Sequence, residues 1–159
     1  MSAKNANKAK NKAKLVTVGW RERVALPDLG VQNIKVKVDT GARTSALHAF
    51  NLKTFTKEGV SWVGFEVHPV QHSQAEAVYV EMPIVDWRKV KSSNGRSERR
   101  PVIRTVAVLG EHAWDVELTL TRRDLMSFRM LLGRQALSKR ALVDVTKSYL
   151  LADPQGRDT

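Results

Sequence analysis

Short runs of alternating polarity dominate the chain from residue 15 onward. In residues 34–38, three β-branched apolar residues alternate with two lysines, which is the period of two expected of a strand with one buried face. Residues 114–121 repeat the alternation over a longer stretch. Residues 102–109 are their predicted hairpin partner, with 110–112 as the connection. We therefore expect a β-hairpin over residues 102–121.

Other segments extend the same pattern. Residues 62–67 and 77–82 are further predicted strands, and Lys57, Glu58 and Gly59 predict a turn before the first of them. Residues 133–139 alone predict a helix, and residues 141–151 predict one or two closing strands. About eight short strands separated by turns indicate an all-β protein with a closed or sandwiched architecture.

The composition divides the chain into one domain and two tails. Residues 1–14 consist almost entirely of Ala, Asn and Lys and contain no aromatic or β-branched residue, so we predict a disordered basic tail. Residues 15–151 form a single predicted domain, because 159 residues are enough for one core. Residues 152–159 are expected to be a flexible C-terminal tail.

Several classes of protein are disfavoured. The chain has no Cys, so disulfides and thiolate metal sites are excluded. No apolar run approaches the roughly 20 residues that span a bilayer, and residues 1–14 lack the apolar segment of a secretory signal. A cytoplasmic protein that does not bind a membrane is the resulting expectation.

The net charge of +11 is concentrated in two places. Five lysines in residues 1–14 contribute +5, and the segment from Arg88 to Arg100 contributes another +5. Only +1 remains for the rest of the chain, so the predicted domain outside this basic segment is nearly neutral. We expect weak polyanion contact through the tail and the basic segment, or no role beyond solubility.

The candidate site begins where the strand 34–38 ends. Asp39 enters a predicted turn, followed by Thr40, Gly41 and Ala42. Gly permits close approach of backbone to backbone, and the Thr40 hydroxyl could hold the turn by hydrogen bonding to the main chain. Taken alone, an Asp in a turn is as compatible with an ordinary surface turn as with catalysis.

A second segment strengthens the catalytic hypothesis. Residues 130–137, Met-Leu-Leu-Gly-Arg-Gln-Ala-Leu, form an apolar strand that ends in Gly133-Arg134 and enters the short helix. Together with Asp39-Thr40-Gly41-Ala42 this resembles the retropepsins, the single-domain aspartic proteases of retroviral type. The resemblance implies a closed β-barrel in which the strand and helix buttress an active-site turn, with Asp39, Thr40 and Gly41 as catalytic residues. We assign Ala42, Arg43 and Arg134 to substrate binding.

Within the retropepsin-like proteins, the chain resembles one bacterial family most specifically. Residues 19–22, 24–30 and 37–49 are similar to a family of retropepsin-like proteins often called "ATP-dependent zinc protease", found alongside ATP-grasp ligases that add glutamate to protein tails. The chain contains neither a phosphate-binding Gly-x-x-x-x-Gly-Lys-Ser/Thr loop nor a His-Glu-x-x-His motif. His68 and His72 are separated by Pro69, which disfavours a helical pair of metal ligands. We therefore predict no cofactor and no metal.

Aspartic proteolysis requires two carboxylates that share one proton. With one Asp-Thr-Gly in the chain, the second Asp39 has to come from a second copy, so a homodimer is expected. The segment from Trp87 to Arg100 is a candidate flap over the substrate. Arg43 departs from the retroviral pattern. A cation there would favour ionised Asp39 or bind a substrate carboxylate, which makes acidic, glutamate-rich peptides plausible substrates.

Three functions therefore remain open. The favoured one is an aspartic peptidase acting as a homodimer. A non-catalytic peptide- or protein-binding module on the same barrel is the alternative. The third is a ribosome- or RNA-associated protein that uses the basic tail and loop, and its binding should depend steeply on salt.

Overall fold

The computed structural model describes residues 15–70, 75–91, 95–122 and 128–152. Strands account for most of them, which confirms the expected all-β class. Helical structure in these ranges is limited to the 3-10 turn η1 (Pro27–Leu29) and to α2 (Arg134–Leu137), which is shorter than the helix predicted over 133–139. Within the same ranges, no helix has the length and apolar character needed to cross a bilayer.

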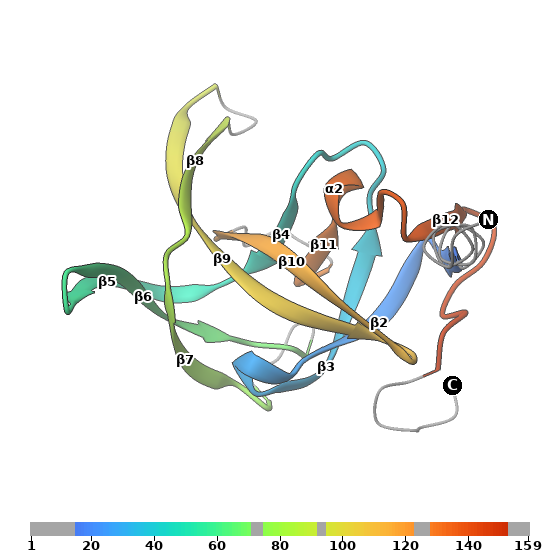
Figure 1. Cartoon of the computed structure of the whole chain (residues 1–159), viewed down its shortest axis with the longest axis horizontal. Coiled ribbons are helices and arrows are strands. Elements are labelled where there is room, and N and C mark those ends of the chain that lie inside the picture. The colour runs from blue at the N-terminus through green and yellow to red at the C-terminus, as the bar shows by residue number, and fades with distance from the viewer. Residues whose placement is uncertain (1–14, 71–74, 92–94, 123–127, 153–159) are drawn as a thin grey trace, which may run out of the picture.

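A closed barrel forms the body of the molecule (Figure 1). Its strands follow one another around the barrel in the order β10 (His112–Thr121), β4 (Ser45–His48), β11 (Met130–Leu132), β3 (Val31–Val38), β2 (Arg21–Leu26) and β9 (Ser97–Leu109). Pairing between β9 and β10 closes the ring, and β4 and β11 contribute parallel pairs with β10 and β3. Of the closed and sandwiched architectures that the strand pattern left open, the structure has the closed one, which confirms the barrel implied by the resemblance.

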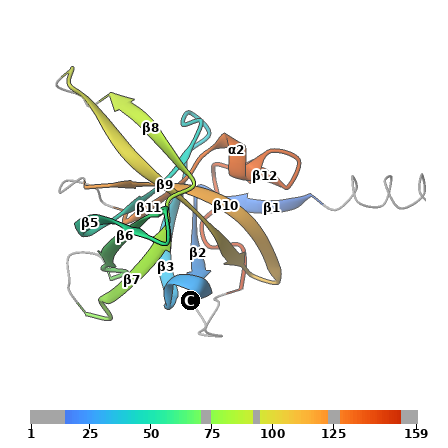
Figure 2. The ribbon, with the colours of Figure 1, turned by 60° about the vertical axis from the view of Figure 1, so that its left-hand side comes forward.

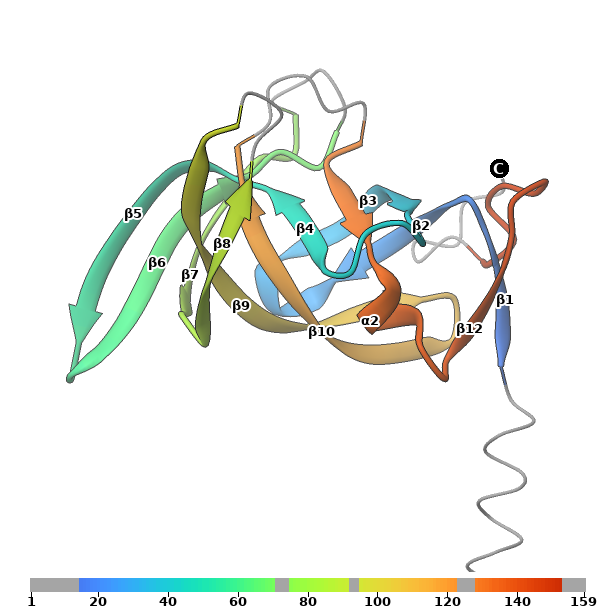
Figure 3. The ribbon, with the colours of Figure 1, turned by 90° about the horizontal axis from the view of Figure 1, so that it is seen from above.

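The hairpin predicted over residues 102–121 and the turn predicted at residues 57–59 are both confirmed. β9 and β10 pair from Leu109 opposite His112, with Gly110 in the left-handed region at φ 58° in the connection. β5 (Phe50–Lys57) and β6 (Val60–Val67) are joined by Glu58 and Gly59, both at positive φ, as in the two-residue turns whose twist matches that of the strands. β7 (Val78–Pro83) completes this second sheet, which extends to one side of the barrel (Figure 3).

A charged stretch that the alternation of polarity did not predict as strand forms a further antiparallel pair. β8 (Asp86–Lys91) pairs antiparallel with the first part of β9, from Asp86 opposite Val102 to Lys91 opposite Ser97. The exposed, polar and charged sequence of this stretch concealed its strands, since neither face is buried by the barrel core. The hairpin projects away from the barrel (Figure 2).

The core fills the barrel and continues under the second sheet. On β2, and on β3 from Ile34 to Val38, every second residue is buried, as the alternation predicts. Side chains from six barrel strands and from β6 meet there, with no exposed surface: Val24, Leu26, Val36, Leu47, Phe65, Ile103, Leu109, Leu118, Leu120, Met130 and Leu132. This core fixes the ends of the strands that surround Asp39.

The C-terminal segment differs from the prediction of closing strands over 141–151. Only β12 (Ala141–Asp144) is a strand, and it pairs in parallel with β1 (Val16–Gly19). Thr146 then donates two hydrogen bonds to Asp144 Oδ1, which lower the pKa of that carboxyl and turn the chain. Alternation of apolar residues indicated a strand here, but side-chain hydrogen bonding ends it.

Glu22 holds the rest of this segment against the barrel. Its carboxylate is fully buried, and it accepts hydrogen bonds from the amides of Gly19 at 2.7 Å, Leu150 at 2.9 Å and Leu151 at 3.2 Å. A side chain at position 19 would collide with the Lys147 carbonyl, so only Gly allows this close approach. The buried carboxylate therefore substitutes for a strand partner.

Replacing Glu22 by Ala should lower the free energy of unfolding by about 3 kcal/mol, because three backbone donors lose a charged acceptor. Urea denaturation measures this loss, and amide hydrogen exchange should show early opening at Leu150. Glu111→Ala, the same change at an exposed turn, serves as control. Equal stability of the two variants would contradict the role assigned to Glu22.

Candidate active site

Strand β3 ends directly in the turn that holds Asp39. The Asp39 amide donates to the Leu132 carbonyl of β11 at 2.8 Å, and its own carbonyl accepts from Ala42 N at 3.2 Å, closing the turn. The Gly41 amide donates to Asp39 Oδ1 at 2.9 Å. Asp39 is half-buried. Its carboxylate is therefore oriented by the turn itself while it stays open to a ligand.

The junction of β11 and α2 supports the turn through hydrogen bonds to the residues that follow Asp39. The amides of Arg134 and Gln135 donate to the carbonyls of Ala42 and Arg43 at 2.8 and 3.1 Å. The Gly133 amide donates to Ser45 Oγ, a buried hydroxyl, at 3.0 Å. The strand and short helix thus meet the Asp39 turn, as the resemblance implied.

Arg134 contacts the turn with its side chain as well. Its Nη1 donates to the carbonyls of Thr40 at 3.1 Å and Gly41 at 3.0 Å. The guanidinium is at the surface, so these bonds orient the turn more than they stabilise the fold. This positioning role was not assigned to Arg134 from the sequence, and its predicted contact with substrate stays a prediction.

Thr40 and Arg43 are both exposed. Among the described residues the Thr40 hydroxyl forms no hydrogen bond, so the turn is held by the Asp39 carboxylate and by Arg134 instead. In the same part of the chain no ion pair joins the Arg43 guanidinium to a carboxylate. Within a single copy, no contact of Arg43 therefore supports its predicted effect on the ionisation of Asp39. The Arg43 side chain is open to a ligand.

A cavity of about 280 Å³ opens beside the Asp39 turn. One side is formed by the turn and the residues that follow it, and the floor by barrel strands β4, β10 and β11. Its lining consists of Asp39, Gly41, Ala42, Thr44, Ala46, Val90, Thr119, Thr121 and Leu131. Asp39 is the one carboxylate among these residues. The predicted site residue Ala42 is thus part of the cavity, whereas Arg43 is not among its lining residues.

Val90 belongs to β8, so the projecting hairpin of β8 and β9 forms one wall of the cavity. The described strands of the candidate flap, residues 87–91 and 97–100, are therefore paired, and Val90 places them at the cavity that Asp39 lines. Sequence analysis did not find Val90, Thr119, Thr121 or Leu131. The alternation in 114–121 was the available signal, since it places Thr119 and Thr121 on the face of the strand opposite to Leu118 and Leu120.

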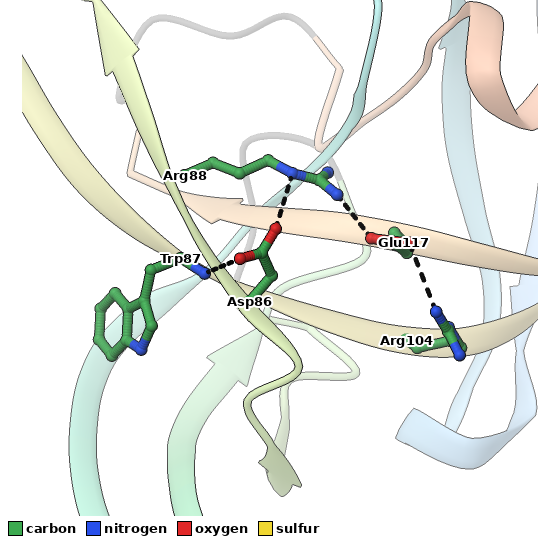
Figure 4. A network of polar contacts seen from close by, with 5 residues as sticks. All are labelled: Asp86, Trp87, Arg88, Arg104 and Glu117. Atoms are coloured by element: carbon green, nitrogen blue, oxygen red, sulfur yellow. Dashed lines mark hydrogen bonds and ion pairs between the residues drawn. The ribbon is translucent and has the colours of Figure 1, made fainter.

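A chain of ion pairs anchors the hairpin to the barrel (Figure 4). Arg88 of β8 donates to Glu117 of β10 at 2.6 Å, and its Nε lies 3.5 Å from Asp86. Arg104 of β9 approaches the other oxygen of Glu117 at 3.5 Å. Because β10 also contributes Thr119 and Thr121 to the cavity floor, these contacts fix the base of the hairpin relative to the floor.

Possible metal ligands do not converge. Among the described residues, no group of three His, Asp or Glu is arranged to hold a metal ion. The ring of His68 stacks on Phe50, and its Nε2 lies 3.9 Å from Glu66 Oε1. His72, the other candidate weighed from the sequence, lies outside the described residues.

A closed barrel with one Asp-Thr-Gly turn, buttressed by a strand and helix near the C-terminus, defines a retropepsin-like protein. Residues 17–154 match the RimB-like family, described as "Retropepsin-like aspartic endopeptidase RimB". The chain belongs to this family, which confirms the resemblance drawn from residues 39–42 and 130–137.

Related sequences carry a different name. A protein of Shewanella pealeana named "Probable alpha-L-glutamate ligase" is 52% identical over 136 residues, which is 86% of this chain. A protein of the same name from Parasynechococcus marenigrum is 47% identical over 138 residues, or 87% of this chain. The chain spans only 30% of the length of each of these relatives.

A solved structure has a similar fold. The crystal structure of a Legionella pneumophila protein with unknown function superimposes with a TM-score of 0.71 at 27% sequence identity. The match covers 85% of this chain and 97% of the other. The two proteins therefore share an overall fold.

Two glycines of the site should respond differently to Ala. At Gly133 a Cβ would lie 2.6 Å from the Thr44 carbonyl oxygen and 2.9 Å from that of Ala42, and backbone cannot yield. Gly133→Ala should therefore lower the free energy of unfolding by about 2–3 kcal/mol, measured by urea denaturation.

Gly41→Ala is the matched control. A Cβ there meets only Asp39 Oδ1, at 3.2 Å, so stability should change by less than about 1 kcal/mol. The Asp39 carboxylate should be displaced instead. If both variants were equally stable, the assignment of Gly133 as the close contact between turn and buttress would be wrong.

Proposed function

We propose that the protein is an aspartic peptidase that acts as a homodimer, with one Asp39 from each copy at a shared site. The observation behind this proposal is the Asp39 turn itself. Its carboxylate is held by the Gly41 amide at 2.9 Å, supported by the β11–α2 junction, and opens into a cavity walled by a β-hairpin. Membership of the RimB-like family supports the same activity.

The chemistry needs only water and two carboxyl groups. Two carboxylates a few ångströms apart cannot both ionise, so one is protonated. The ionised Asp39 removes a proton from a water molecule, and the oxygen of that water attacks the carbonyl carbon of the scissile peptide bond. The protonated Asp39 of the second copy donates to the carbonyl oxygen. The tetrahedral intermediate then collapses: the second Asp39 takes a proton back from a hydroxyl group as the C=O bond reforms. The C–N bond breaks, and the amine leaves with the proton held by the first Asp39, which restores both carboxyl groups.

The second copy is a requirement of this mechanism. Asp39 is the one carboxylate among the described residues that line the cavity, and a single carboxylate cannot be both base and acid in the same step. A two-fold axis beside the turn would bring two identical turns together. The exposed Thr40 and Gly41 leave the outer side of the turn accessible to such a partner.

The hairpin of β8 and β9 would close over a bound peptide. Val90 already lines the cavity, and the ion pair from Arg88 to Glu117 holds the base of the hairpin at 2.6 Å. A flap of this kind excludes water and positions the substrate backbone. Movement would then be confined to the part of the hairpin beyond Arg88.

Acidic peptides are the proposed substrates. Exposed cations occur near the site, with Arg43 after the turn and Lys89, Lys91 and Arg99 on the face of the hairpin opposite to Val90. The longer relatives are named alpha-L-glutamate ligases, so a module that recognises glutamate-rich tails is compatible with their name.

A binding module without catalysis is the second candidate, and those relatives favour it. In them, about 70% of the length lies outside the region matched here, and the printed name refers to ligation and not to proteolysis. In that case the barrel would hold an acidic peptide beside Asp39 without cleaving it. The predicted polyanion contact of the basic tail is a separate property under either function.

Asp39→Asn should separate the two candidates. Asn is isosteric and keeps an oxygen for the Gly41 amide, so the fold is retained, while loss of the base should reduce hydrolysis at least about a thousandfold. The assay is cleavage of glutamate-rich peptides followed by mass spectrometry. Asp28→Asn, at an exposed position, is the control. Unchanged cleavage by Asp39→Asn would exclude the aspartic mechanism.

Subunit mixing tests the shared site. Titrating the wild-type protein with excess Asp39→Asn should reduce its activity toward zero, since mixed dimers hold only one competent carboxylate. Specific activity should also fall on dilution below the dimer dissociation constant. Activity that stays proportional to the amount of wild-type chain, whatever the excess of variant, would rule out a site built from two copies.

A further inference from the structure

We propose that the outer face of the β2–β3 hairpin is a subsite for the acidic side chains of a peptide that lies in the Asp39 cavity. We call this face the basic strip and define it by Arg21, Arg23, Lys35 and Lys37. The inference rests on the proposed role of the cavity in peptide binding, and it extends the substrate contacts beyond the turn and the hairpin.

The strip consists of two like-charged cross-strand pairs. In the register of β2 and β3, Arg21 lies opposite Lys37 and Arg23 lies opposite Lys35. Directly opposed like charges destabilise a sheet, so folding alone does not favour this arrangement. In the described part of the chain, none of the four cations forms an ion pair with a carboxylate. The strip therefore has positive charge available for an anionic ligand.

The two arginines are held in place by aromatic rings. Arg21 Cζ lies 4.6 Å from the ring centroid of Trp20 and 5.0 Å from that of Tyr149, and Arg23 Cζ also lies 5.0 Å from Tyr149. Arg21 Nε donates to Ser148 at 3.2 Å. The buried Nε of Arg23 has no hydrogen-bond partner. Side chains already restrained in this way lose less entropy when they bind a carboxylate.

The strip is continuous with the cavity. Across the barrel, Arg21 pairs with Lys37, Lys37 with Leu131, and Leu131 with Ala46. Paired residues point to the same side of a sheet, so these side chains form one row on the outer surface of the barrel. Leu131 and Ala46 line the Asp39 cavity. A chain that leaves the cavity along this row reaches Lys37 first and Arg21 next.

The ligand that fits best is an acidic polypeptide in extended conformation. Alternate residues of a strand are roughly 7 Å apart and point to the same side. An extended peptide that reaches Lys37 and then runs along β3 therefore presents carboxylates at the spacing of Lys37 and Lys35. Nucleic-acid binding would favour free aromatic faces for base stacking. Here the rings of Trp20 and Tyr149 have guanidinium groups over them.

The experiment measures binding without cleavage. Full-length protein with Asp39→Asn is titrated into a fluorescein-labelled peptide of eight glutamates, followed by anisotropy. The test variant adds Lys35→Gln and Lys37→Gln. The matched control adds Lys53→Gln and Lys57→Gln, which remove the same charge from β5. The test variant should raise the dissociation constant about fivefold, at two modest charge contacts, and the control less than about twofold.

Three outcomes would overturn the proposal. The first is a test variant that binds the peptide with the affinity of the Asp39→Asn parent. The second is an equal loss in both, which would mean a response to net charge only. The third is an eight-nucleotide single-stranded RNA that binds more tightly than the peptide and loses more affinity in the test variant, since the strip would then be a nucleic-acid surface. Thermal melting checks that each variant is folded. If the double variant unfolds, Lys37→Gln alone replaces it, and the expected change in the logarithm of the dissociation constant is then about half as large.

The result is independent of the peptidase activity. Strip-dependent binding of octaglutamate supports the inference even if the wild-type protein cleaves nothing, in which case only the catalytic proposal fails. If the wild-type protein cleaves acidic peptides but the test and control variants bind equally well, the proposed subsite on the basic strip is wrong. The proposed peptidase function is then unaffected.

Discussion

The hydrogen bonds between the Asp39 turn and the β11–α2 junction determine where every other part of the site lies. Through them, the Leu132 carbonyl fixes the Asp39 amide, and the Arg134 amide fixes the Ala42 carbonyl. Backbone approaches backbone so closely here that position 133 has no room for a side chain. A retropepsin-like turn is thus not a property of residues 39–42 alone, because its shape is imposed by a strand about ninety residues later in the chain.

The closed barrel makes this contact possible. β11 is inserted between β3 and β4, in parallel with one and antiparallel to the other, so the segment after Asp39 and the segment before Arg134 must meet. Its buried side chains face the core, and its remaining residue, Leu131, faces outward to the cavity. One short strand therefore contributes to stability on one side and to the site on the other.

Charged side chains are unevenly distributed over the outer surface of the barrel, and the net charge does not show this. Outside the tail and the segment 88–100 the charges nearly cancel, yet Arg21, Arg23, Lys35 and Lys37 share one face of the barrel. On another face, the carboxylate of Glu117 is satisfied by Arg88 and Arg104. Strand pairing decides which charges become neighbours. The near neutrality of the chain outside its tail and hairpin was therefore a poor guide to where an anion could bind.

Much of this protein followed from its sequence alone. Alternating polarity in residues 34–38 and 102–121 determined the strands and their buried faces, and the Asp-Thr-Gly and Leu-Gly-Arg segments determined the family, since both depend on local chemistry. The β8–β9 hairpin, the irregular path after Asp144 and the roles of Val90, Leu131 and Glu22 depended on tertiary structure. Their residues have no local pattern, because exposed strands lack a buried face and a buried Glu is explained only by the distant amides it accepts from. The physical reason is that periodicity records which face of a segment is buried, whereas only the folded chain decides which segment lies opposite.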